Sequence, residues 1–248
     1  SNAAVDLSTY YLLRWTNGND DPTLKTSLST ECGSSLPAYT FCIISNDTNS
    51  STNNFLNTYG FEPYGRVGTN STADSNGDDN IAIVTSESGI TYNNSSTWTV
   101  IDMFGVVGED GSGTAHEFED GRAERLSTVK TPQSTWSAAH WEIDNDGGAN
   151  AGAQDAPGGY DPGYWIGATS IDTWNGLSST AWATGSNWAS GSAPESGDNV
   201  FIRDSGTDPV ISTTTVQITN LTVESSGVLT INADSDLTLS GNFSNSAG

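Results

Sequence analysis

Short apolar runs bounded by turn-forming residues most constrain what this chain can fold into. Residues 10–15 (YYLLRW), 80–85 (NIAIVT) and 98–107 (WTVIDMFGVV) are rich in β-branched and aromatic residues, and clusters of Gly, Asn, Asp and Ser separate such runs. Helical periodicity is almost absent. The sequence therefore predicts an all-β fold. Further strands are expected at residues 38–44, 113–118, 121–126 and 140–143.

The pattern changes near Gly167, after which the strands become only three to five residues long. Closely spaced apolar pairs are separated there by Ser-Gly or Ala-Asp corners, as stacked rungs of a β-solenoid require. The pairs are Leu221 and Val223, Leu229 and Ile231, and Leu237 and Leu239. A sandwich of ordinary hairpins, forming a second small β domain, is the alternative. No cap is evident at residues 244–248, so we expect the natural protein to continue or the first domain to close the coil.

These patterns divide the chain into three segments. Ser1, Asn2 and Ala3 are typical of what remains after a purification tag is cleaved, and they are set aside. Residues 4–168 form the first domain, and residues 169–248 form a solenoid-like segment that we expect to be truncated. No apolar run approaches the roughly 20 residues needed to span a bilayer, so no membrane insertion is expected.

The charge of the chain is strongly negative. Seven Lys and Arg residues face 30 Asp and Glu residues, which gives a formal net charge of −23. Nucleic acid is an unfavourable partner, because binding to phosphates needs a basic surface. Eight Trp, eight Tyr and seven Phe supply enough apolar area for a core. The acidic, lysine-poor composition fits a secreted protein in a saline environment.

Cys32 and Cys42 are the two cysteines of the chain, ten residues apart in a turn-rich segment. This spacing allows a disulfide, which for such a short loop stabilises a fold by roughly 2–3 kcal/mol. Two buried thiols are the alternative. A pair so close together in an otherwise cysteine-free chain favours the disulfide and an oxidising compartment.

Four segments together resemble the lamin-tail domain family, in the form found on secreted bacterial proteins. They are residues 5–18 (VDLSTYYLLRWTNG), 75–84 (SNGDDNIAIV), 100–125 (VIDMFGVVGEDGSGTAHEFEDGRAER) and 131–143 (TPQSTWSAAHWEI). The resemblance covers residues 4–168 and implies an immunoglobulin-like antiparallel β-sandwich, appended to surface proteins or secreted enzymes and without catalysis of its own. The usual apolar first strand is missing before residue 5, which would leave a sheet edge unpaired.

Charged side chains crowd residues 108–125 (GEDGSGTAHEFEDGRAER). On a strand, His116, Phe118 and Asp120 would lie on one face and Glu117 and Glu119 on the other, so we expect no catalytic site there. The lamin-tail resemblance implies that residues 118–125 (FEDGRAER) form a hairpin. Arg122 and Arg125 would point to opposite faces and pair with nearby carboxylates rather than with a ligand.

Three acidic loops offer oxygen ligands for a structural calcium or sodium ion, although none has EF-hand spacing. Capping of turns and plain solvation are the alternative for each loop. The candidate ligands are Asp74, Asp78 and Asp79 in the first loop, Glu109 and Asp110 in the second, and Asp144 and Asp146 in the third.

No nucleophile elbow, phosphate-binding loop or zinc-binding helix motif occurs in the sequence, and no catalytic or cofactor-binding residue is predicted. We therefore expect a non-catalytic structural, adhesion or display module of a larger secreted or cell-surface bacterial protein, with a protein or glycan surface as partner. The alternative is an accessory glycan-binding module of a secreted enzyme, with calcium as an optional ligand, which would need two or three coplanar, exposed aromatic side chains.

Overall fold

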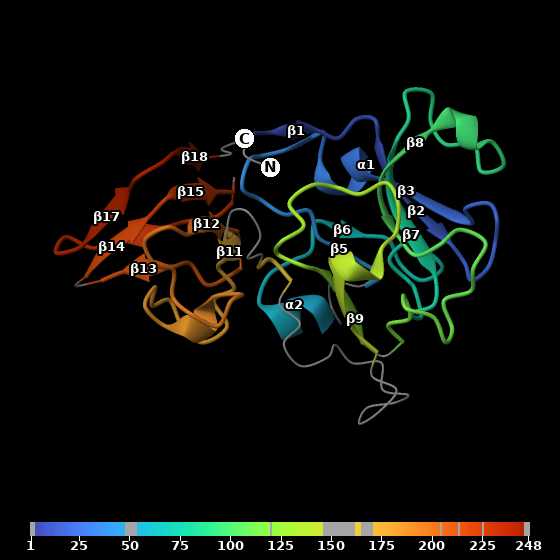
Figure 1. Ribbon diagram of the computed structural model, residues 1–248. Coiled ribbons are helices and arrows are strands. Elements are labelled where there is room, and N and C mark those ends of the chain that lie inside the picture. Colours follow the sequence, from blue (N-terminus) through green and yellow to red (C-terminus); the bar gives the residue numbers. More distant parts are fainter. Residues whose placement is uncertain are drawn as a thin grey trace.

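The computed structural model describes residues 3–47, 54–119, 121–145, 162–164, 171–203, 205–212, 214–224 and 226–245. Nearly all of its regular structure is β (Figure 1), with antiparallel sheets followed by a solenoid-like coil. The predicted fold class is therefore confirmed. Among the described residues, no helix combines the length and the apolar character needed to cross a membrane.

A four-stranded antiparallel sheet forms the centre of the first part, in the order β3-β2-β7-β8. Strands β2 and β7 coincide with predicted runs, and alternate residues of β7 are buried, so one face of the sheet covers a core. Leu13, Trp15, Ala82, Val84 and Met103 form that core. The strands are β2 (Tyr10–Trp15), β3 (Leu24–Ser27), β7 (Asn80–Thr85) and β8 (Thr99–Phe104).

Smaller elements surround this sheet, and several differ from expectation. Only Ile44 of residues 38–44 lies in a strand, and residues 113–118 form turns rather than a strand. Two short helices were not predicted, since five or six residues are too few to show helical periodicity. These elements are β1 (Val5–Asp6) with β4 (Ser35–Leu36), β5 (Ile44–Ser45) with β6 (Gly65–Arg66), α1 (Leu28–Cys32), α2 (Asn54–Tyr59), η1 (Ser95–Thr97) and η2 (Ala138–His140).

The prediction of a hairpin within residues 118–125 (FEDGRAER) is also wrong. Strand β9 (Arg122–Arg125) pairs instead with β10 (Trp141–Asp144), so a long connection replaces the tight turn. The aromatic side chains of this ribbon explain the pairing, because Trp141 packs against Phe104 of the central sheet with ring centroids 4.9 Å apart. Tertiary packing has overridden the local turn signal.

The second part is a solenoid-like arrangement of parallel strands, here called the coil. Its strands stack in three columns (Figure 1). This pairing excludes ordinary hairpins and matches the rung pattern expected from the sequence. The first column is β11 (Ile171–Thr173), β12 (Asn199–Ile202), β15 (Asn220–Val223) and β18 (Phe243–Asn245). The second is β13 (Val210–Ile211) and β16 (Thr230–Ile231), and the third is β14 (Thr215–Ile218) and β17 (Asp236–Leu239).

A tryptophan-rich loop fills the first turn of the coil. Trp174, Trp182 and Trp188 are almost fully buried in the same cluster as the apolar residues of β12 and β14. Part of this loop runs parallel to β13, because Ala181 forms a parallel bridge with Val210. It includes η3 (Gly185–Asn187) and lies below β13 in Figure 1. The coil interior is therefore closed at this end.

Candidate functional site

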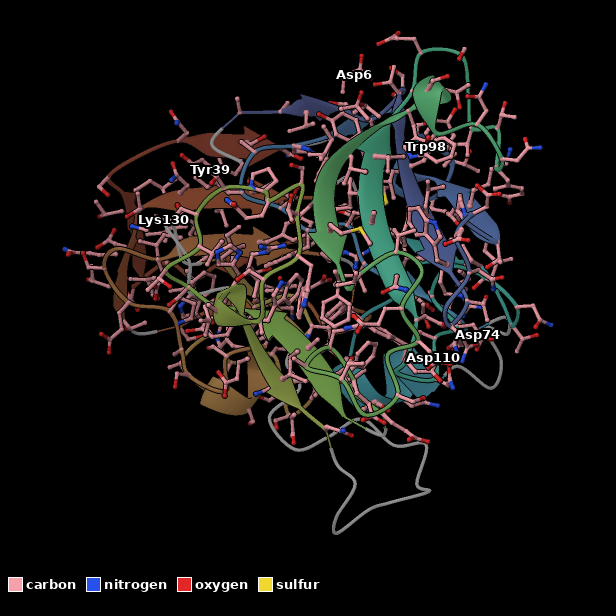
Figure 2. The ribbon with its side chains drawn as sticks, turned by 45° about the vertical axis from the view of Figure 1, so that its right-hand side comes forward. Asp6, Tyr39, Asp74, Trp98, Asp110 and Lys130 are labelled. Atoms are coloured by element: carbon pink, nitrogen blue, oxygen red, sulfur yellow. A yellow bond between two sulfur atoms is a disulfide. The ribbon has the colours of Figure 1, made fainter. Side chains whose placement is uncertain are left out.

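Three loops meet at one end of the four-stranded sheet and bring an asparagine and four acidic residues together. We call this set the acidic junction, and it consists of Asn17, Asp78, Asp79, Glu109 and Asp110. Figure 2 shows Asp110 and Asp74 at this end and Trp98 at the other. The antiparallel order of β2, β7 and β8 produces the arrangement, since the end of β2, the start of β7 and the end of β8 lie side by side. The structure thus brings two of the three predicted acidic loops together.

Asn17 holds the junction together through hydrogen bonds. Its Nδ2 lies 3.1 Å from Asp78 Oδ2 and 3.2 Å from Asp110 Oδ2, and its backbone N–H donates to Asp79 Oδ1 over 2.9 Å. Asn17 adopts a left-handed conformation with φ of 51°, which asparagine tolerates better than most residues. One amide group therefore neutralises part of the repulsion between two carboxylates.

Further donors pair with Asp79 and Asp110 of the junction and with Asp74 beside it. Arg14 lies 3.4 Å from Asp79, and both side chains are almost completely buried. The side chain of Asn46 and the backbone of Asn70 donate to Asp74 and lower its pKa. The backbone N–H of Ser112 donates to Asp110 and lowers its pKa as well. These partners make the junction a hydrogen-bonded structural network.

The predicted metal ligands do not converge on one point. Within the described ranges, no group of three or more His, Cys, Asp or Glu side chains is placed to hold a metal ion. Asp144 is exposed on β10, and Asp146 lies outside the described residues. Asp78 Oδ1 is the one oxygen of the predicted ligand set that is buried without a hydrogen-bond partner among the described residues.

His116 is a buried core residue and does not lie on a strand as expected. It is 1% exposed, its Nδ1 lies 2.9 Å from Thr114 Oγ1, and its ring packs edge-on against Phe104 and Trp136. Burial lowers the pKa of His116, although the carboxylates of Glu109 and Asp110 oppose this shift. His116 is therefore an uncharged core residue, although charged residues flank it in the sequence.

Arg203 joins the two parts of the chain. It follows β12 and is 5% exposed, and its guanidinium carbon lies 4.0 Å from the ring centroid of Tyr64 and 5.4 Å from that of Phe61. Its Nη1 donates to the carbonyl of Glu62, and its Nε lies 3.3 Å from Glu224 Oε2. Sequence reasoning missed this residue, although an arginine directly after the apolar run NVFI was a signal.

Asp172 is a second buried charged group outside the predicted sites. It lies on β11 and is 4% exposed. Its two carboxylate oxygens accept hydrogen bonds from the backbone N–H and the hydroxyl of Ser190, at 3.1 and 2.7 Å. Burial dominates over these bonds and raises the pKa of Asp172 to about 6.

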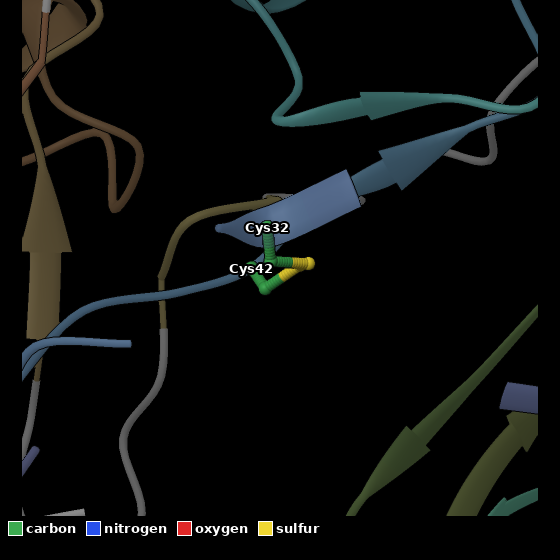
Figure 3. The surroundings of a disulfide bond; sticks show 2 residues. All are labelled: Cys32 and Cys42. Carbon is green, nitrogen blue, oxygen red and sulfur yellow. A yellow bond between two sulfur atoms is a disulfide. The ribbon is translucent and has the colours of Figure 1, made fainter. Parts of the chain in front are cut away.

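Cys32 and Cys42 form a disulfide that links α1 to the segment before β5 (Figure 3). The two Cα atoms are 5.7 Å apart, within the usual span of such a bridge. The enclosed loop contains Ala38, whose carbonyl oxygen lies 3.5 Å from Thr222 Oγ1 of the coil. The disulfide therefore fixes a loop that contacts the second part of the chain.

The tryptophans bear on the glycan-binding alternative. Trp15, Trp174, Trp182 and Trp188 are buried, and the other three described tryptophans are half-buried. Trp136 and Trp141, the first residue of β10, pack with Phe104 in an aromatic cluster. The described tryptophans thus serve packing.

Comparison with known proteins reaches only the coil. Residues 173–248 match the model of a family described as a domain of unknown function (DUF8693). The match begins within β11 and includes the tryptophan loop and the remaining strands of the coil. Neither the curated proteins nor the solved structures gave a match.

Proposed function

We propose that this chain is a non-catalytic structural module, which acts in adhesion or display within a larger secreted or cell-surface bacterial protein. The observation that carries the proposal is the contact between the first part and the coil. A module that positions other domains must keep its own parts at a fixed angle. Buried contacts that depend on orientation serve that purpose better than a flexible linker.

The Arg203 contacts depend on orientation. A cation above an aromatic ring is held within a narrow range of positions, and the Glu62 carbonyl and the Glu224 carboxylate fix the guanidinium from its edges. Rotation of the coil against the first part would break the contacts of Arg203 with Tyr64, Phe61 and the Glu62 carbonyl together, and would leave Glu224 of the coil as its remaining partner among the described residues.

Gly60 tightens the same contact. A methyl group at this position would lie 2.3 Å from the carbonyl oxygen of Asn175 and 2.8 Å from the side chain of Leu177, so the two backbones approach as closely as glycine permits. The φ of Gly60 is 79°, in the left-handed region. A larger residue would therefore push the coil away.

The lamin-tail resemblance and the strongly acidic composition support a secreted, non-catalytic setting. The disulfide is consistent with an oxidising compartment. The described tryptophans are all buried or half-buried, so they do not support the glycan-binding alternative. That alternative stays the second candidate.

Small-angle X-ray scattering tests whether the first part and the coil keep a fixed angle. We expect a single compact arrangement to fit the wild-type scattering curve, and we expect Gly60→Leu to have a larger radius of gyration. Gly113→Leu is a matched control, because a Cβ at that left-handed glycine has no neighbouring atom within 4 Å. A wild-type curve that requires an ensemble of angles would contradict the proposal.

The non-catalytic and adhesive parts need separate assays. We expect no turnover of polysaccharide, nucleic acid or phosphoester substrates, and turnover that one carboxylate substitution abolished would make the chain an enzyme. Binding to a glycan array that depended on one tryptophan would favour the glycan-binding candidate instead.

A further inference from the structure

Apolar side chains lose their cover in the last turn of the coil. Leu221 of β15 is 2% exposed, whereas Phe243, its register partner on β18, is 59% exposed. In the second column, Ile211 is 0% exposed and its partner Ile231 is 45% exposed. Equivalent positions thus change from core to surface within one turn, because no strand stacks on them among the described residues.

The uncovered side chains surround a hollow of about 420 Å³. We call this surface the end face. It lies opposite the end of the coil that the tryptophan loop fills. Its main apolar residues are Leu229, Ile231, Leu237, Leu239 and Phe243.

A ladder of asparagines fixes how a strand must stack on this end. Asn199 and Asn220 are register partners, and Asn220 Nδ2 donates to Asn199 Oδ1. One turn later, the backbone N–H of Asn242 donates to Asn220 Oδ1 over 2.6 Å. The asparagines recur at intervals of 21 and 22 residues. In both steps the side-chain oxygen of one asparagine accepts a hydrogen bond from the asparagine of the next turn, from its side chain in the first step and from its backbone in the second.

We propose that the end face binds a further rung of this same repeat. The rung is a β segment of one turn that adds parallel strands to β16, β17 and β18. It carries apolar residues at alternate positions to fill the hollow and an asparagine in register with Asn242. The proposal rests on the rung-to-rung interface already present between β12 and β15, and between β14 and β17. It does not depend on the function proposed above.

A second copy of the chain is a poorer occupant. Its first turn is filled by Trp174, Trp182 and Trp188, so it has no open parallel rung to offer. Two end faces meeting about a twofold axis would pair antiparallel, which breaks the asparagine ladder. Each copy also carries a net charge of −23, so association is opposed by charge repulsion.

A grafted rung tests the proposal. A copy of residues 203–223, a 21-residue turn that carries the β13, β14 and β15 sequences, is inserted after Asn245 of the full chain. Because this sequence differs from β16 and β17, amide exchange in these two strands can be followed by mass spectrometry. We expect exchange there to slow at least tenfold. The matched control insert carries serine at the copies of Ile211, Val216 and Ile218, and it should leave exchange unchanged.

Three results would overturn the proposal: equal exchange with and without the graft, equal protection by the serine control, or a dimer of the unmodified chain that already protects β16 and β17. Circular dichroism shows whether the elongated chain folds. Where it does not, the unmodified chain is titrated with a synthetic peptide of residues 203–223. Saturable binding that slows exchange in β17 then supports the proposal, and no binding overturns it.

Discussion

The guanidinium carbon of Arg203 lies 4.0 Å from the ring centroid of Tyr64, so a cation from the coil rests on an aromatic ring of the first part. Burial raises the pKa of Tyr64 against the opposing effect of Arg203, and the phenol therefore stays neutral. The cation is thus satisfied by the π face, by the carbonyl of Glu62 and by the Glu224 carboxylate. This combination explains how an arginine can be almost fully buried.

Arg203→Met should lower the free energy of unfolding by about 2–4 kcal/mol, because it removes a buried ion pair and a desolvated cation–π contact. Arg122→Met is the matched control. The pair of Arg122 with Glu124, at 3.8 Å, is longer and less buried than that of Arg203 with Glu224, so we expect a smaller loss than in Arg203→Met. Urea unfolding followed by tryptophan fluorescence measures both. Equal losses in the two variants would contradict a special role for Arg203.

The coil was predictable from the sequence because its signal is local. The apolar pairs Leu221 with Val223 and Leu237 with Leu239 recur on strands of two different columns, and short strands between polar corners can bury those side chains only by stacking. The strands β2 and β7 were predictable for the same reason, since each carries its apolar pattern within six residues.

The acidic junction and the Arg203 contact were not predictable, because they depend on distant segments. Asn17 meets Asp78 and Asp110 only after three strands align, and no spacing in the sequence encodes that meeting. The strand assumed around His116 was wrong because aromatic packing against Phe104 replaces alternation there. Residue type alone suggested a metal ligand set, whereas the fold supplies amide and guanidinium partners.

Asp172 predicts an unusual pH dependence. Its pKa is raised to about 6 in the folded state from 3.8, so the folded state binds a proton more tightly than the unfolded state. Its contribution to stability is therefore complete below pH 3.8 and is lost as the pH rises through about 6. Asp172→Asn keeps both Ser190 contacts, because the Ser190 hydroxyl can accept from the amide while donating to Ser192.

Relative to wild type, Asp172→Asn should gain on the order of 2–3 kcal/mol between pH 4 and pH 7. Urea unfolding at each pH measures the difference. Asp144→Asn, which changes an exposed carboxylate, corrects for the general effect of charge. A difference between Asp172→Asn and wild type that stays constant with pH would show that Asp172 ionises freely.

His116 predicts a loss of stability in acid. Because burial lowers its folded pKa below 6.5, the unfolded state binds the proton more readily. Stability from this residue is full above pH 6.5 and falls as the pH drops toward the folded pKa. NMR titration of the two histidines measures the folded-state pKa of His116, and the His116→Gln variant assigns its resonance. A His116 resonance that titrates at or above pH 6.5 would contradict this expectation.

Calcium should stabilise the acidic junction only through general screening. Asn17 Nδ2 already lies between the Asp78 and Asp110 carboxylates, so an ion would have to displace it. We expect calcium and magnesium to raise the unfolding midpoint equally, and Asp110→Asn to keep that rise. A rise specific to calcium and lost in Asp110→Asn would instead establish the ion site that the sequence suggests.

The disulfide between Cys32 and Cys42 should stabilise the first part and its contact with the coil. Closing so short a loop contributes roughly 2–3 kcal/mol by restricting the unfolded chain. The double variant Cys32→Ala with Cys42→Ala avoids a free thiol and should lose that amount in urea unfolding. Thr222→Val, which removes the hydroxyl facing Ala38, separates the contact with the coil from the loop itself. Intact mass should be lower by two hydrogens than after reduction, and an unchanged mass would show that the thiols are free.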